Sequence, residues 1–94
     1  MRVDIADIVI PLNGRDAGAR FLVIGSEEEY SLLADGKGRR VEKPKRKKNK
    51  HVVLEDKAVD WIAERLRSGD KVSNSEVRRA LAEYTLARQS EGGM

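Results

Sequence analysis

Short strand-like runs fill the first half of the chain, of which the first is β-branched, and glycines and charged residues separate them. Runs of this kind predict β-strands, here over residues 7–12, 20–25, 30–34, 39–42 and 51–54. Pro11 stands near the end of the first run, where a missing ladder donor is tolerated. Asn13-Gly14 and Asp35-Gly36 are turn signals typical of hairpins. The pattern therefore predicts an antiparallel β-domain over residues 1–54.

After residue 54 the apolar spacing changes to that of one face of an α-helix. Two successive sets follow the i, i+3, i+4, i+7 spacing: Val59, Ile62, Ala63 and Leu66, then Val77, Ala80, Leu81 and Tyr84. These sets predict two short amphipathic helices, which form a helical hairpin over residues 55–88. Their apolar faces must be buried against each other, against the β-domain or against a partner. Residues 89–94, which include Gly92-Gly93, are expected to form a flexible tail.

The residues at the ends of these helices fit capping patterns. Asp56 is a candidate N-cap of the first helix, and Gly69 follows its last apolar position as a terminating glycine does. Ser73 and Glu76 have the spacing of a capping box, which places the start of the second helix at this point.

Charge is distributed unevenly along the chain. Residues 37–51, the basic segment, hold nine of the 19 Lys and Arg residues and a single acid, Glu42. The net charge of the basic segment is therefore +8, whereas the whole chain is +3, so the remainder sums to −5. Clustered Lys and Arg residues are typical of a surface that binds a polyanion, because phosphates with condensed counterions favour concentrated positive charge.

Basic runs also occur as solvated tails, localisation signals and disordered linkers. The basic segment, however, lies in the middle of the chain, and strand-like residues flank it at residues 30–34 and 51–54. Val41 interrupts it as an inward-facing strand residue would. This position favours a strand-and-loop surface, in which residues 43–50 span the fourth and fifth strands.

The loop between the first two strands resembles a known motif. Residues 14–20 read Gly-Arg-Asp-Ala-Gly-Ala-Arg between two apolar strands, which resembles the KOW motif of ribosomal large-subunit proteins and transcription elongation factors. Gly18 matches the central glycine of that motif, where a positive φ is expected, and Arg15 and Arg20 match basic positions. Alanines on both sides of the glycine depart from the motif, in which lysines are common, so weaker phosphate binding by this loop is expected.

The resemblance extends over residues 3–54 and is most specific at residues 33–48, which are similar to short bacterial KOW-domain RNA-binding proteins. It implies an SH3-like five-stranded β-barrel that the fifth strand closes, followed by the C-terminal helical hairpin. The fold class is then β with a small α appendage. Closure would remove the aggregation-prone edges of an open sheet. The resemblance also implies binding to structured RNA, and to ribosomal RNA of the large ribosomal subunit in particular.

Contacts to RNA are expected mainly at phosphates, because A-form RNA hides its base edges in a narrow groove. Gly14 and Gly18 are expected to shape the first loop, and the side chains of residues 45–48 are expected to point largely to solvent. The residues that we expect to contact RNA are Arg39, Arg40, Lys43, Lys45, Arg46, Lys47, Lys48 and Lys50, followed by Arg15, Arg20, Lys37 and His51.

Other chemistry finds little support in the sequence. The chain has no cysteine, and His51 is its only histidine, so neither a metal site nor a cofactor is expected. Phosphate-binding loops and nucleophile motifs are absent, and no enzymatic activity is expected. Aromatic residues are too few for a platform that stacks single-stranded bases, and Phe21 and Tyr30 are expected in the core.

No uninterrupted apolar run approaches the roughly 20 residues that cross a bilayer, so we expect a soluble cytoplasmic protein without membrane contact. The pattern gives no indication of the oligomeric state. An alternative function is a protein-interaction module of the transcription or translation machinery, because elongation-factor KOW domains also bind proteins. In that case the helices, with Trp61, would dock on a partner, and the basic segment would meet an acidic surface.

Overall fold

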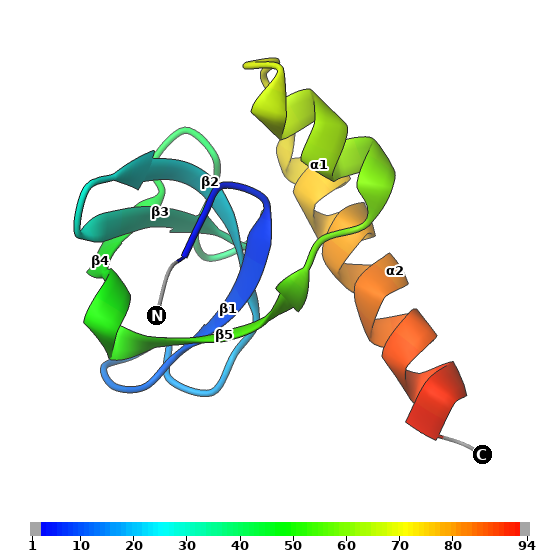
Figure 1. Ribbon diagram of the computed structural model, residues 1–94, viewed down its shortest axis with the longest axis horizontal. Coiled ribbons are helices and arrows are strands. Elements are labelled where there is room, and N and C mark those ends of the chain that lie inside the picture. Colours follow the sequence, from blue (N-terminus) through cyan, green and yellow to red (C-terminus); the bar gives the residue numbers. More distant parts are fainter. Residues whose placement is uncertain (1–2, 93–94) are drawn as a thin grey trace.

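Between residues 3 and 92, which the computed structural model describes, five antiparallel strands form one sheet with the order β4-β3-β2-β1-β5 (Figure 1). The strands are β1 (Asp7–Pro11), β2 (Phe21–Glu27), β3 (Tyr30–Ala34), β4 (Lys45–Lys48) and β5 (Val52–Lys57). The 3-10 turn η1 (Asn49–His51) joins the last two strands, and two helices follow, α1 (Asp60–Arg67) and α2 (Asn74–Gly92). The prediction of a mostly β fold with C-terminal helices is therefore confirmed.

The strands β1 and β2 are buried on both faces, which explains their continuous apolar sequences. Ile8 and Leu22 pair across the two strands and face the helices, whereas Val9 and Phe21 form the next pair and face the opposite way. The sheet curls around this second face (Figure 1). Its buried side chains form one cluster, namely Val3, Val9, Phe21, Val23, Leu33 and Val52. Phe21 is thus a core residue, as predicted.

The other face of the sheet is covered by α1 and α2 (Figure 1). Apolar side chains of both helices are buried with Ile8 and Leu22 in a second cluster, and its helical members are Ile62, Ala63, Leu66, Val77, Ala80 and Tyr84. Trp61 lies at the margin of this cluster, where its indole N–H donates to Glu83 at 2.6 Å and the Arg79 guanidinium lies 4.9 Å from the ring centre. Most of each predicted amphipathic face is therefore buried on the sheet, and Val59 and Leu81 are half-buried where they pack against this cluster.

The prediction of a fourth strand over residues 39–42 is wrong. Those residues belong to the loop between β3 and β4, and the fourth strand lies further along, at Lys45–Lys48. Val41 is apolar because it packs against the helical cluster, and its N–H donates to the side chain of Asn74 at 2.8 Å. Lysine has a low intrinsic β-propensity, so the strand conformation of β4 depends on its pairing with β3.

The predicted closed barrel is not formed by residues 3–92, because β4 and β5 are the two edges of the sheet and are not hydrogen-bonded to each other. The sheet nevertheless curls far enough for the three residues of η1 to connect these edges (Figure 1). β5 pairs with β1 as far as Lys57, beyond the expected limit at Leu54. Irregular pairing between Ile8 and Val9 indicates a bulge, which bends the strands locally.

The C-terminus of α1 is a Schellman motif, and Gly69 is its terminating glycine, as predicted. Gly69 has a φ of +82°. Its N–H donates to the carbonyl of Leu66 at 3.1 Å, and the N–H of Asp70 donates to the carbonyl of Arg65 at 3.0 Å. These two hydrogen bonds satisfy carbonyls that the end of a helix leaves without partners.

Two predicted boundaries differ from the structure. Asp56 is not the N-cap of α1, because β5 continues through it and Val59 occupies the N-cap position. α2 continues to Gly92, so residues 89–92 are helical where a tail was expected, and residues 93–94 lie outside the described residues. None of the helices between residues 3 and 92 combines the length and the apolar content that crossing a membrane requires.

The capping box at the start of α2 is confirmed. The N–H of Glu76 donates to Ser73 Oγ at 3.1 Å, and the N–H of Ser73 donates to Glu76 Oε1 at 2.9 Å. The hydrogen bond from Ser73, together with the nearby Arg65 guanidinium, holds the pKa of the Glu76 carboxyl below its ordinary value. The carboxylate therefore stabilises the fold above the ordinary pKa of about 4.3, and this contribution is lost as the pH falls through the lowered pKa.

We expect Glu76→Gln to make the free energy of unfolding less dependent on pH in the acidic range. The variant should be less stable than the wild type at about pH 6, and the difference should shrink by about pH 3, where the carboxylate is being protonated. Urea melts at both pH values measure this difference. Glu64→Gln is the matched control, because Glu64 is exposed on α1 and makes no ion pair with a described residue. A wild type and Glu76→Gln that lose stability equally on acidification would contradict the prediction.

The β1–β2 loop (residues 12–20) contains two glycines, Gly14 and Gly18, and each has a φ of +85°, which confirms the positive φ predicted for Gly18. A Cβ added at Gly18 would have no atom within 4 Å, so only backbone strain opposes a side chain there. Gly18→Ala should therefore cost about 1–3 kcal/mol of stability. Gly38→Ala is the control and should be neutral or slightly stabilising, because Gly38 has open space and no positive φ. Equal denaturant midpoints for the two variants would show that the Gly18 backbone is unstrained.

Candidate nucleic-acid interface

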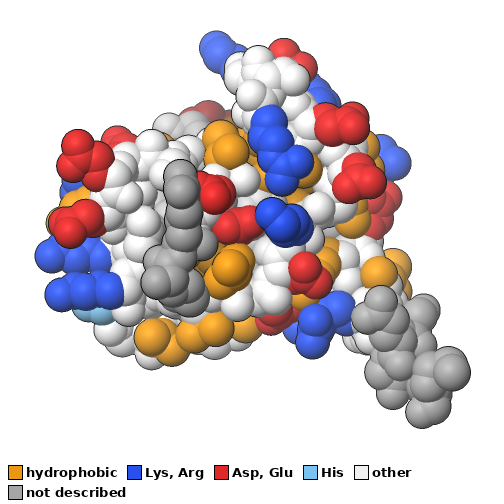
Figure 2. All heavy atoms as spheres, viewed as in Figure 1, with side chains coloured by type: hydrophobic (Ala, Val, Ile, Leu, Met, Phe, Trp, Pro, Cys, Tyr) orange, Lys and Arg blue, Asp and Glu red, His pale blue; other side chains and the backbone are white. Residues whose placement is uncertain are grey.

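The basic segment forms a continuous stretch of surface at one side of the sheet. It supplies most of the β3–β4 loop (residues 35–44), all of β4, and η1, where His51 is half-buried. Figure 2 shows Lys and Arg side chains gathered over β4 and η1 at the left edge of the molecule, with acidic side chains beside them. The expectation that residues 43–50 span two strands is corrected, because residues 43–44 end the β3–β4 loop, residues 45–48 form the fourth strand itself, and residues 49–50 belong to the turn after it.

Alternate side chains of β4 lie on opposite faces of the sheet. Lys45 and Lys47 share the face of the buried side chains of β3, whereas Arg46 and Lys48 share the other face with Tyr30. Arg46 is exposed, but the three lysines are half-buried, because the stem of a lysine covers apolar surface before its amino group reaches solvent. The expectation that all four point largely to solvent holds for Arg46 only.

Arginine and lysine side chains have different surroundings in the basic segment. Its three arginines each lie within ion-pair distance of an acid: Arg39 of Asp16 at 2.8 Å, Arg40 of Glu42 at 3.3 Å, and Arg46 of Glu27 at 2.7 Å. Its six lysines form no ion pair with a described residue, and they are Lys37, Lys43, Lys45, Lys47, Lys48 and Lys50. Arg39 and Arg46 therefore tie the segment to the rest of the fold, Arg40 pairs within the segment, and the lysines hold the charge that is available to an anion.

The β1–β2 loop lies against the basic segment. Lys47 Nζ donates to the backbone carbonyl of Asn13 at 3.1 Å and to its side-chain oxygen at 2.9 Å. Asp16 of the same loop accepts a hydrogen bond from Arg39 Nε at 3.0 Å. These contacts place Arg15, which is exposed, in a loop that touches both β4 and the β3–β4 loop.

The β3–β4 loop is fixed by the N-terminal turn of α2. Asn74 is buried, accepts the N–H of Val41 at 2.8 Å and donates to Glu42 at 2.7 Å. Arg78 donates to the carbonyl of Gly36 at 2.6 Å. A hydrogen bond from its own backbone N–H lowers the pKa of the Glu42 carboxyl, and the bond from Asn74 adds to this effect. The loop that carries Lys37 and Lys43 is therefore anchored to α2 and is not a free linker.

Asn49 anchors η1 to the turn between β2 and β3. Its backbone N–H donates to the carbonyl of Glu29 at 2.8 Å, its side chain donates to the carbonyl of Glu28 at 3.3 Å, and its side-chain oxygen accepts from the buried Ser31. An open groove of about 780 Å³ lies here, and its charged lining residues are Asp4, Glu28, Glu29, Lys48 and Lys50. The acids make this end of the surface less favourable for a phosphate than the end near the β1–β2 loop.

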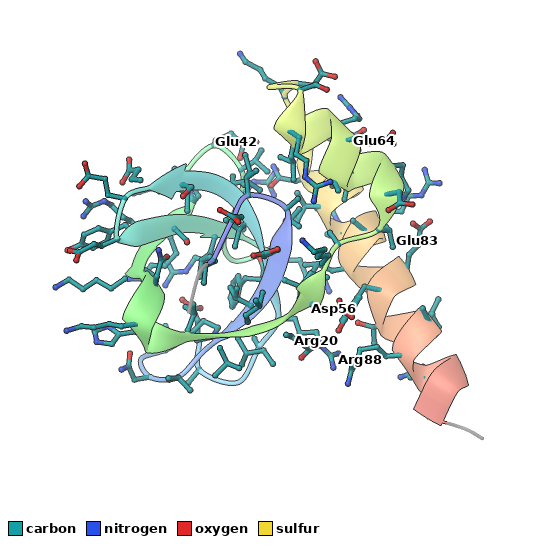
Figure 3. All side chains as sticks on the ribbon, viewed as in Figure 1. Arg20, Glu42, Asp56, Glu64, Glu83 and Arg88 are labelled. Atoms are coloured by element: carbon teal, nitrogen blue, oxygen red, sulfur yellow. The ribbon has the colours of Figure 1, made fainter. Side chains whose placement is uncertain are left out.

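Arg20, which we expected to contact RNA, lies at the junction between the sheet and α2. Its Nε donates to Glu55 at 2.7 Å, and its guanidinium lies 5.6 Å from the centre of the Tyr84 ring. Arg88 approaches the same carboxylate at 3.7 Å and donates to the Tyr84 hydroxyl at 3.1 Å, and Figure 3 shows both arginines between the sheet and α2. Burial raises the pKa of the Tyr84 hydroxyl. Arg20 is therefore occupied in holding α2 on the sheet.

Several residues that shape this surface were not predicted from the sequence. Asn13, Asn49 and Asn74 each bond to a segment distant in the chain, and no local pattern indicates such partners. Tyr30 was expected in the core, but it is half-buried and the Arg46 guanidinium lies 3.6 Å from its ring centre. The only available signal was the alternation of β3, which places Tyr30 on the face opposite Leu33.

A comparison with protein-family models finds no match, and a search of curated proteins finds no significantly similar sequence. The resemblance to KOW proteins therefore stays a prediction from the motif. Among the described side chains, no three acidic or histidine residues are grouped so that they could hold a metal ion.

Gly36→Ala should release the β3–β4 loop from α2. A Cβ at Gly36, whose φ is +79°, would lie 2.4 Å from the backbone carbonyl oxygen of Asn74. Backbone strain of about 1–3 kcal/mol and overpacking of similar size should make this change more destabilising than Gly18→Ala. Denaturant melts of the two variants measure the difference, and a smaller loss for Gly36→Ala than for Gly18→Ala would contradict the described docking of the loop.

Proposed function

We propose that this protein binds structured RNA through its basic segment, and that the RNA is ribosomal, as the resemblance to KOW proteins implies. The observation that carries the proposal is the set of six lysines without acidic partners among the described residues. They stand on a loop, a strand and a turn that are each anchored to the rest of the fold. A cytoplasmic location, at the large ribosomal subunit, is part of the same proposal.

The arrangement of the strands supports an SH3-like assignment. The order β4-β3-β2-β1-β5 is a curled antiparallel meander that is extended by β5 beside β1, and it brings the β1–β2 loop next to β4. We infer an open variant of the SH3-like barrel, in which Gly18 occupies the position of the central KOW glycine. Its φ of +85° is what that position requires.

Phosphate contacts account best for the chemistry of the surface. An ammonium group is a compact charge on a flexible stem, which suits a phosphate oxygen without requiring a fixed geometry. Lys45 and Lys47 are alternate residues of one strand, so their backbone positions lie about 7 Å apart on the same face. Such a row can follow successive phosphates of a rigid RNA backbone, which positions the protein without reading base sequence.

The alternative function, a protein-interaction module, required the helices and Trp61 to be available to a partner. The apolar faces of both helices are buried on the sheet. Trp61 is half-buried, is hydrogen-bonded to Glu83 and has the Arg79 guanidinium over its ring. The feature that favoured this alternative is therefore absent from the described residues, and RNA binding is the function that we propose.

The triple substitution of Lys43, Lys45 and Lys50 by Gln tests the proposal. Each phosphate contact contributes roughly 0.7–0.9 to the slope of log affinity against log salt concentration, so losing three contacts should flatten the slope by about 2–3. Affinity for a structured RNA hairpin should fall clearly at low salt. Fluorescence anisotropy with a labelled hairpin, over a series of salt concentrations, measures both quantities.

The matched control removes the same charge elsewhere, by substituting Lys57, Arg67 and Lys71 with Gln. All three are exposed and lie on β5 or near the end of α1. The control should change the salt slope much less than the triple lysine variant does. Equal slopes for the wild type and the triple variant, with both folded by circular dichroism, would remove the proposed interface.

A further inference from the structure

Arg46 differs from the other cations of β4 because its guanidinium is fixed in orientation. It lies 3.6 Å from the centre of the Tyr30 ring, and its Nε donates to Glu27 Oε1 at 2.7 Å. In the sheet, Arg46 is paired with Leu32, so Tyr30 lies diagonally across the ladder within reach of a long side chain. The Tyr30 ring and the Glu27 carboxylate together determine the position of the guanidinium plane of Arg46.

The positive charge of the Arg46 guanidinium is neutralised by an acidic partner, whereas the lysines of the basic segment have no such partner among the described residues. Glu27 forms an ion pair with Arg46, and the hydrogen bond that it accepts raises the pKa of the guanidinium. A phosphate would have to compete with that carboxylate, whereas an uncharged ring would not. The side chain of Arg46 remains 56% exposed, so the ring of Tyr30 covers one side of the group and solvent reaches the rest.

We propose that Arg46 provides a stacking surface for one unpaired nucleobase of a bound RNA. Planar guanidinium groups stack on aromatic rings, and unstacked RNA bases are recognised by stacking on such planes. Bound in this way, the base, the guanidinium and the Tyr30 ring form a three-layered stack at the edge of the sheet. The proposal rests on the proposed function and specifies the RNA further: a duplex held by the lysines, with one nucleotide outside its stack.

One stacking site does not make a platform for a continuous single strand, which needs several exposed rings. Of the other aromatic side chains, Phe21 is buried inside the curled sheet, while Trp61 and Tyr84 lie on the helices, at the opposite side of the molecule from β4 (Figure 1). Lys48, opposite Tyr30 in the ladder, has its amino group 5.8 Å from the same ring. It adds positive charge beside the stack for the backbone of the displaced nucleotide.

The test uses two RNA hairpins that are identical except for one bulged 2-aminopurine. The wild type should bind the bulged hairpin about 5- to 150-fold more tightly, which is the range for one stacked base, and should protect the 2-aminopurine from quenching by acrylamide. Arg46→Lys keeps the charge but lacks the plane, so it should lose both the preference and the protection. Arg40→Lys is the matched control and should keep both, because Arg40 is exposed, pairs with Glu42 and lies over no aromatic ring of a described residue.

A second variant, Glu27→Gln, leaves Arg46 intact and removes its anionic partner, and it should weaken the preference for the bulge by less than Arg46→Lys does. A wild type that binds both hairpins equally tightly would overturn the stacking proposal while RNA binding stands. A wild type that binds neither hairpin would overturn the proposed function and the stacking proposal with it. Arg46→Lys with an undiminished preference for the bulged hairpin would also overturn the stacking proposal.

Discussion

Four consecutive cations in one strand repel one another, and the surface described above depends on the contacts that offset this repulsion. Backbone pairing with β3 holds β4 extended along its whole length. Tyr30 and Glu27 contact Arg46 from two sides, and Asn13 receives the amino group of Lys47. An exposed ion pair contributes at most about 1 kcal/mol, so no single contact suffices. Positive charge can be concentrated on β4 because several neighbouring groups each offset part of the repulsion between its side chains.

Periodicity in the sequence predicted the elements whose structure is decided locally. Three of the predicted runs became β1, β2 and β3, the helical spacing became α1 and α2, and Gly69 ended a helix where its position indicated. β4 was misplaced because lysine carries little strand preference of its own and pairing with β3 decides its conformation. Barrel closure could not be predicted either, since it depends on whether two strands from distant parts of the sheet meet in register.

The candidate site was predicted in position but not in detail, for a similar reason. Clustered charge located the basic segment, but the partner of each cation is set by the tertiary structure. Arg20 bonds to Glu55, which lies 35 residues away in the sequence, and no spacing pattern contains that information. Arg39 and Arg46 likewise meet acids on other elements. The sequence therefore indicates where positive charge gathers, and the fold decides which of it is neutralised.

The open sheet has two edges of opposite character. β4 presents four basic side chains, and charged residues on an edge strand oppose the addition of another strand. β5 presents Val53 and Leu54, which are 43% and 36% exposed, and its charged residues are confined to its second half, Glu55, Asp56 and Lys57. Addition of a foreign strand is therefore opposed along the whole of β4 and less strongly at the apolar first half of β5. The lysines that we propose to bind RNA therefore have a second effect, because their charge also opposes edge-to-edge aggregation.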